Sequence, residues 1–257
     1  MRWRPLTVLA LLLAAWGMGA AQAQVKAEDV PLEEWAVGVL AADWRASDGT
    51  PIEAFENARR DLTRAFGEAG FDPVNIADLS LRPRWLGGTS LVSELAFAAI
   101  ASRAQSAKAG CLLYFTSHGS PEGIVLGSEG LLSPLRMAAL VNEWCGERPT
   151  VVVVSACYSG VFVPALAAPN RMVMTAARPD RSSFGCSADS DYPYFDACVI
   201  KSLPTADDFV HLASMTRRCV AFREQAENLM PPSEPLVHMG ADVEDLFVFL
   251  NFERPAP

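Results

Sequence analysis

The chain has 257 residues, 51% of them hydrophobic, with 30 acidic and 21 basic side chains and a formal net charge of -9. This acidic balance argues against a nucleic-acid partner and gives no reason to expect binding to an anionic membrane surface. The length suffices for one large domain or two small ones. Because no low-complexity linker or repeat divides the chain, we expect a single domain over residues 24–257.

Residues 1–23 have the pattern of a secretory signal peptide. Arginines at positions 2 and 4 form a basic start, residues 6–15 are apolar, and Ala-Gln-Ala at 21–23 fits a small-residue cleavage site. The apolar run is shorter than the ~20 residues that a membrane-spanning helix needs. We therefore expect cleavage after Ala23, export to a periplasmic or extracellular location, and no membrane anchor afterwards.

Apolar runs of strand length alternate with amphipathic segments along the remaining chain. Six runs predict buried strands, at residues 35–42, 74–77, 111–116, 151–155, 171–175 and 235–240. Helical spacing predicts helices at residues 50–69, 90–107, 133–145, 205–229 and 242–252. The first of these helices is expected to open with a capping box formed by Thr50 and Glu53. Continuous apolar strands separated by helices indicate an α/β fold whose mostly parallel sheet is covered on both faces.

Two chemically active side chains follow predicted strands directly. His118 comes just after the strand at 111–116, and Cys157 comes just after the strand at 151–155. Ligand sites in parallel sheets lie at the carboxyl ends of the strands, so the loops that carry these two residues are expected to share one edge. The other histidines, His211 and His238, fall within a predicted helix and a predicted strand, where ordinary structural roles are expected.

A cysteine and a histidine at one site suit nucleophilic catalysis. The thiolate is the nucleophile, and His118 would take the proton of Cys157 and later return it to the leaving amine. The N–H groups of Gly119 and Cys157 would donate to the developing oxyanion. Asp43 and Asp48 lie on a neighbouring loop and would orient His118. From the residues alone, a buried and inert Cys157 is an equally good interpretation.

Six cysteines remain beyond the signal segment, and an exported protein can oxidise them. If Cys157 stays free, at most two disulfides form and one further thiol is unpaired. A bridge from Cys186 to Cys198 or to Cys219 is one option, and spacing alone leaves the pairing open. No spacing typical of a metal site is present, so we expect no metal and no cofactor.

Three segments resemble a known family of cysteine peptidases. "YFTSHGSP" at 114–121, "VVVVSACYSGVF" at 151–162 and "MTAARPDRSSFGCS" at 174–187 are similar to blocks of the legumain-type asparaginyl endopeptidases, which are caspase-like. The resemblance extends over about residues 35–203. It implies a caspase-like three-layer α/β/α sandwich, hydrolysis of peptide bonds by His118 and Cys157, and a bacterial relative of the family.

The resemblance also suggests where the substrate side chain would bind, and where this chain departs from the family. Legumains have a glutamate after the catalytic cysteine, where this chain has Tyr158. The residues that match the pocket of the family, or that would line it, are Ser182, Ser183, Arg45, Asp196 and Asp189. The departures leave the residue preference of the pocket open.

Three functions remain in view from the sequence. The first is an exported cysteine endopeptidase that acts on a peptide or protein substrate through a thioester. The second is a transamidase or ligase that uses the same thioester, and the third is a non-catalytic peptide-binding protein on the caspase-like fold. The oligomeric state is left open.

Overall fold

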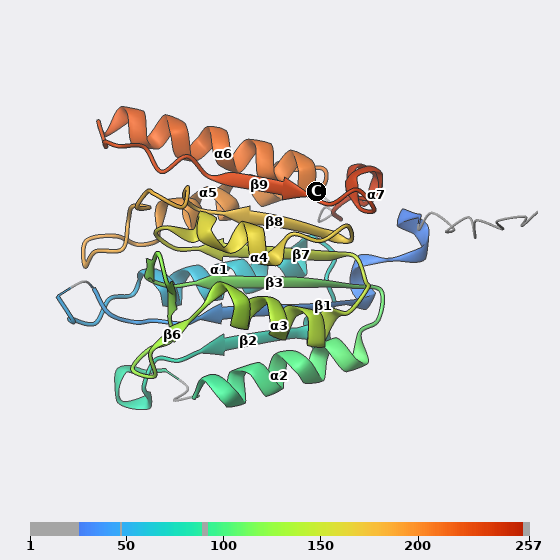
Figure 1. Ribbon diagram of the computed structural model, residues 1–257, viewed down its shortest axis with the longest axis horizontal. Helices are drawn as coiled ribbons and strands as arrows, with labels where there is room; N and C mark the ends of the chain where they lie inside the picture. Colours follow the sequence, from blue (N-terminus) through green and yellow to red (C-terminus); the bar gives the residue numbers. More distant parts are fainter. Residues whose placement is uncertain (1–25, 47, 89–91, 254–257) are drawn as a thin grey trace, which may run out of the picture.

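The computed structural model describes residues 26–46, 48–88 and 92–253, so the predicted signal peptide at 1–23 lies outside the described residues. Its centre is a six-stranded sheet in the order β2-β1-β3-β7-β8-β9 (Figure 1). The strands are β1 (Trp35–Ala41), β2 (Ile76–Ser80), β3 (Gly110–Thr116), β7 (Thr150–Ser155), β8 (Arg171–Thr175) and β9 (Leu236–Met239). All pair in parallel except β9, which runs antiparallel to β8 at the edge. The mostly parallel sheet of six strands is confirmed, but the strand expected at 74–77 lies later, because residues 73–75 form a 3-10 turn.

Helices cover both faces of this sheet, as the apolar strands require. The α-helices are α1 (Ala54–Glu68), α2 (Ser93–Ser106), α3 (Pro134–Cys145), α4 (Val163–Leu166), α5 (Tyr194–Ser202), α6 (Phe209–Ala226) and α7 (Glu244–Phe249). Short 3-10 turns are η1 (Ala27–Asp29), η2 (Leu32–Glu34), η3 (Pro73–Asn75), η4 (Arg84–Leu86), η5 (Ser159–Phe162) and η6 (Leu203–Thr205). In Figure 1, α3 and α4 cross one face of the sheet, while α1 and α5 lie behind it.

Two hydrophobic cores follow from the alternation of side chains along each strand. In β7, Val151 and Val153 join the core beneath α1, α5 and α6, whereas Val152 and Val154 join the core beneath α2, α3 and α4. All four valines are buried. The run of four valines is therefore explained by a strand that is covered on both faces.

Some local predictions need correction. The Thr50–Glu53 capping box does not form: the Thr50 hydroxyl donates to Asp48, and α1 begins at Ala54 without a side-chain cap. The long helix expected from residue 205 is two elements, η6 and α6, and Asp208 caps α6 by accepting from the N–H of His211. The sequence reasoning also missed α5, α4 and a small antiparallel sheet made of β4 (Gly119–Ser120), β5 (Gly123–Val125) and β6 (Leu131–Leu132).

The cysteines pair differently from the option that involved Cys186. Disulfides join Cys111 to Cys145 and Cys198 to Cys219, while Cys157 and Cys186 are free. The expectation of two bridges and one further free thiol is confirmed, but the bridge from Cys186 is wrong. The first bridge ties the start of β3 to the end of α3, and the second ties α5 to α6.

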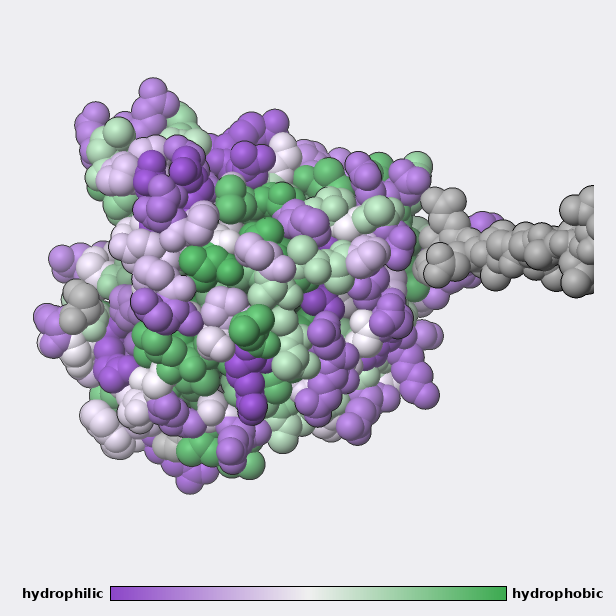
Figure 2. Space-filling view, in the orientation of Figure 1, coloured by the Kyte–Doolittle hydropathy of each residue, from purple (hydrophilic) through white to green (hydrophobic). Residues whose placement is uncertain are grey.

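None of the helices in the described ranges is long and apolar enough to cross a membrane. The face of the molecule in Figure 2 carries hydrophobic residues interspersed with hydrophilic ones.

Replacing both Cys198 and Cys219 by alanine should lower the free energy of unfolding by about 3 kcal/mol. The bridge links residues 21 apart in the sequence and restricts the unfolded chain accordingly. Urea unfolding of wild type and variant without reductant measures the difference. The matched control is Cys186→Ala, which removes a free thiol and should cost about 1 kcal/mol or less. An equal loss in the control would contradict the assigned pairing.

Candidate active site

The two predicted site residues lie at the same edge of the sheet. Strands β3 and β7 are parallel neighbours, and Thr116 opposite Ser155 is the last pair of their register. The N–H of Ser117 also donates to the Ser155 carbonyl, at 3.1 Å. His118 and Cys157 each follow two residues after this last pair, so both leave the sheet at its carboxyl edge.

The two loops touch at Gly119. A Cβ atom at this position would lie only 2.2 Å from the carbonyl oxygen of Cys157, so only glycine allows this approach. The same contact brings the backbone after His118 against the backbone of Cys157. In the part of the chain that the structure describes, the N–H of Cys157 has no hydrogen-bond acceptor.

The His118 ring is held by a backbone carbonyl. Its Nε2 lies 2.7 Å from the Arg45 carbonyl oxygen, and the Phe55 ring packs edge-on at a centroid distance of 5.1 Å. A carbonyl oxygen only accepts, so Nε2 carries the proton and Nδ1 keeps its lone pair. The hydrogen bond thus selects the tautomer in which Nδ1 is the basic nitrogen.

The buried carboxylate of Asp43 fixes Arg45, whose carbonyl in turn positions the His118 ring. Asp43 accepts from Arg45 Nε at 2.9 Å, and the guanidinium also donates to the Gly127 carbonyl. Of the two aspartates expected to orient His118, neither has a hydrogen bond to its ring among the described residues. Asp43 acts on it only through Arg45, and Asp48 is exposed and binds Thr50.

Arg45 therefore faces the site with its main chain. The predicted substrate-binding role needs a free guanidinium, but two partners already occupy this one and its side chain is 32% exposed. No sequence pattern could indicate the carbonyl contact, because any residue type presents the same backbone oxygen.

The thiol of Cys157 has partners on the loop after β8. Its Sγ accepts from the Ser183 N–H at 3.2 Å and lies 3.6 Å from the Ser183 hydroxyl. The next residue, Tyr158, has φ 57° and ψ 11° in the left-handed region, and its N–H donates to the Arg181 carbonyl at 2.8 Å. A non-glycine residue in this region costs on the order of 1–3 kcal/mol, so the surrounding contacts must hold the turn. Of the predicted pocket residues, Ser183 therefore contacts the thiol directly.

Ser182 and Asp189 are exposed on the same loop, and Asp196 lies under the site. Asp196 is fully buried in α5, where it accepts from the Tyr114 and Thr116 hydroxyls, both at 2.5 Å, and from Ser155. The expectation that Asp196 contacts substrate is corrected, because its carboxylate is closed off and fully bonded. It ties α5 to Thr116 and Ser155, the last residues of β3 and β7.

Burial raises the pKa of Asp196 to about 6, although hydrogen bonds from Ser155, Thr116 and Tyr114 oppose the shift. The sequence reasoning missed this arrangement because it missed α5, and so it had no element on which to place the aspartate. A Tyr-x-Thr pair that points inward from a buried strand was the one available signal of a buried polar partner.

Cys186 is a second thiol near Cys157. It packs partly buried beside Ala41, Ile52, Ala54 and Phe55. Burial raises its pKa well above the ordinary value, and the nearby Cys157, Asp196 and Asp43 add to the shift. The thiol of Cys186 therefore stays protonated at neutral pH.

Comparison with protein families found one match. Residues 99–217 match the model of the Peptidase C13 family. This C13 segment runs from within α2 to within α6 and contains His118, Cys157 and Ser183, while Asp43 and Arg45 lie outside it. The predicted resemblance to the legumain family is confirmed.

The fold is shared with solved caspase structures. Caspase-1 from Spodoptera frugiperda matches with a TM-score of 0.59 over 82% of this chain and 88% of that chain, at 12% sequence identity. No curated protein sequence matches the chain. The caspase-like fold is therefore confirmed, and the fold and the C13 segment together support a cysteine-type peptidase.

No group of three or more histidine, cysteine, aspartate or glutamate side chains in the described residues is arranged to hold a metal ion.

Asp196→Asn should remove a pH dependence of stability. The folded protein binds more protons at Asp196 than the unfolded chain between about pH 4 and about pH 6, so this group lowers stability as the pH rises through that range. Relative to the variant, wild type should lose on the order of 2–3 kcal/mol of unfolding free energy from about pH 4 to about pH 7. Urea unfolding across this range measures the difference.

The matched control is Asp189→Asn, which neutralises an exposed carboxylate on the neighbouring loop. Its stability should follow that of wild type at each pH. If the curve for Asp196→Asn also ran parallel to wild type, the raised pKa would be disproved.

Proposed function

We propose that this protein is an exported cysteine endopeptidase that hydrolyses peptide bonds with Cys157 as nucleophile and His118 as base. The observation that carries the proposal is the hydrogen bond from His118 Nε2 to the Arg45 carbonyl, next to the loop that presents Cys157. A histidine with a purely structural role would not need to lie beside the loop that carries a cysteine. The C13 match to the segment that contains both residues gives independent support.

The reaction follows from the tautomer of His118. Nδ1 takes the proton of Cys157, and the thiolate attacks the carbonyl carbon of the substrate peptide bond. The oxyanion would be stabilised by the N–H groups of Cys157 and Gly119, each worth about 3–4 kcal/mol in sites of this kind. His118 then gives its proton to the leaving amine, which leaves a thioester on Cys157. Water, deprotonated by His118, hydrolyses the thioester and restores the thiol.

The loop that follows β8 is the proposed wall of the substrate pocket. Ser183 contacts the Cys157 thiol, and Ser182 is exposed beside it. This loop is held against the Cys157 loop by the hydrogen bond from the Tyr158 N–H to the Arg181 carbonyl. The wall thus presents the hydroxyl group of Ser183 near the proposed nucleophile. We propose that this wall, rather than the occupied guanidinium of Arg45, selects the substrate side chain.

Cys157→Ala should abolish cleavage of a positional-scanning peptide library, with a loss of at least ~10³-fold. His118→Ala should be nearly as damaging, because members of a nucleophile–base pair fail together. The assay compares both variants with wild type on the same library, which also reports the residue preference. Full activity in Cys157→Ala would disprove the proposal.

The second free thiol provides the control. Cys186→Ala makes the same chemical change at the other unpaired cysteine and should retain cleavage within about tenfold of wild type. Iodoacetamide should label native Cys157 faster than Cys186, whose raised pKa keeps it protonated. Equal, slow labelling of both thiols would instead favour a non-catalytic peptide-binding protein.

Export rests on the signal pattern at residues 1–23, and the two disulfides support it, because such bonds persist in oxidising compartments. The protein expressed with its full N-terminal sequence should reach the periplasm or medium with Gln24 as its first residue. N-terminal sequencing of the exported protein checks this, with a variant carrying Arg2→Glu and Arg4→Glu as the control that should export less. A retained N-terminal methionine on the folded protein would contradict export by cleavage.

A further inference from the structure

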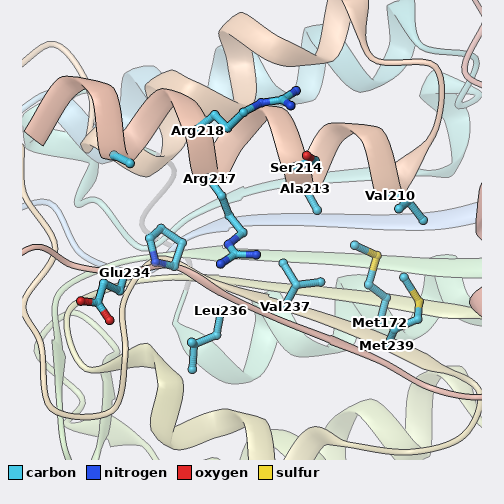
Figure 3. A pocket seen from close by; sticks show the side chains of 12 residues that line it. Met172, Val210, Ala213, Ser214, Arg217, Arg218, Glu234, Leu236, Val237 and Met239 are labelled. Carbon is cyan, nitrogen blue, oxygen red and sulfur yellow. The ribbon is translucent and has the colours of Figure 1, made fainter.

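A groove lies at the β9 edge of the sheet, away from β3 and β7. A cavity of about 710 Å³ separates α6 from β9, which is the last strand of the sheet (Figure 3). Its floor and sides are mostly apolar. They include Met172, Val210, Ala213, Val237 and Met239. Val210 and Val237 are each 36% exposed, so apolar surface remains uncovered here.

The groove runs along an open strand edge. In the described residues, β9 pairs with β8 on one side and with no strand on the other. The N–H of Gly240 donates to the Arg171 carbonyl, which continues the ladder beyond β9. Because alternate residues of an antiparallel pair face the partner strand, Val237 and Met239 direct their backbone N–H and C=O groups outward. The edge therefore offers backbone hydrogen bonds to an added strand.

The side chain of Arg217 lies near this edge. Arg217 extends from α6 across the groove toward β9, whereas the adjacent Arg218 points away from it (Figure 3). Arg217 is exposed and has no acidic partner among the described residues. The one carboxylate that lines the groove, Glu234, is paired with Arg178 at 2.9 Å. An arginine without an acidic partner beside apolar surface favours an anionic ligand.

We propose that the groove between α6 and β9 binds an extended peptide segment that carries an acidic residue. The segment would add to the sheet through the outward backbone groups of Val237 and Met239. Its apolar side chains would cover the methionines and valines of the groove, and its carboxylate would pair with Arg217. This site is separate from the proposed catalysis and does not depend on it.

The test uses the full chain with Cys157→Ala, so that no peptide is cleaved. The probe is a short fluorescein-labelled peptide of valine and threonine with one central glutamate, and a second probe carries lysine in its place. Fluorescence anisotropy should show that the glutamate peptide binds at least about fivefold more tightly, and that added salt reduces the difference.

Arg217→Glu should weaken binding of the glutamate peptide by about three- to tenfold and improve binding of the lysine peptide. The matched control is Arg218→Glu, which makes the same charge change on the neighbouring residue, whose side chain borders the groove but points away from β9. Bound glutamate peptide should also slow amide exchange at Val237 and Met239, the readout of strand addition.

Three results would overturn the proposal. They are an equal loss of binding in both arginine variants, equal affinity for both peptides, or no protection at Val237 and Met239. Failure of this test leaves the peptidase assay with Cys157→Ala unaffected, and failure of that assay leaves this test unaffected. Light scattering on the unliganded protein adds a further arm: a concentration-dependent dimer abolished by Arg217→Glu would assign the edge to a second copy instead.

Discussion

The parallel pairing of β3 with β7 is the interaction on which the site depends. The shared register of the two strands ends at the pair Thr116 and Ser155. Two residues beyond this pair, the loops that follow β3 and β7 leave the sheet. The two loops meet where Gly119 approaches the Cys157 carbonyl. The positions of His118 and Cys157 relative to each other are thus set largely by the backbone hydrogen bonds of the sheet.

Polar groups beneath the site reinforce this arrangement at some cost. In the part of the chain that the structure describes, Asp196 is buried without a cationic partner, and its carboxylate is stabilised by hydroxyl donors from β3 and β7. Tyr158 adopts a strained backbone conformation immediately after Cys157. Strain and buried charge persist only where the surrounding contacts determine them. Here the strained residue directly follows Cys157, and the buried carboxylate is bonded to Ser155, two residues before Cys157.

The tautomer of His118 is decided by a contact between segments far apart in the sequence. Arg45 lies 73 positions before the histidine, and the contact uses its carbonyl, while Asp43 and Gly127 hold its side chain. The family resemblance predicts that Arg45 binds substrate. The structure gives it a positioning role through the main chain, and Ser183 is left as the pocket residue nearest to the thiol.

The sequence by itself determined the strands, the two-sided burial of the sheet and the placement of His118 and Cys157 at strand ends. Those features are local: a run of valines, a following Ser-Ala-Cys and the alternation of apolar segments are written in consecutive residues. Only the tertiary structure decided the disulfide partners, the support from Asp196 and Arg45, and the open edge of β9. Each of these depends on the distance between residues that are remote in the chain, and a backbone carbonyl or an unpaired edge carries no side-chain signature that a sequence can reveal.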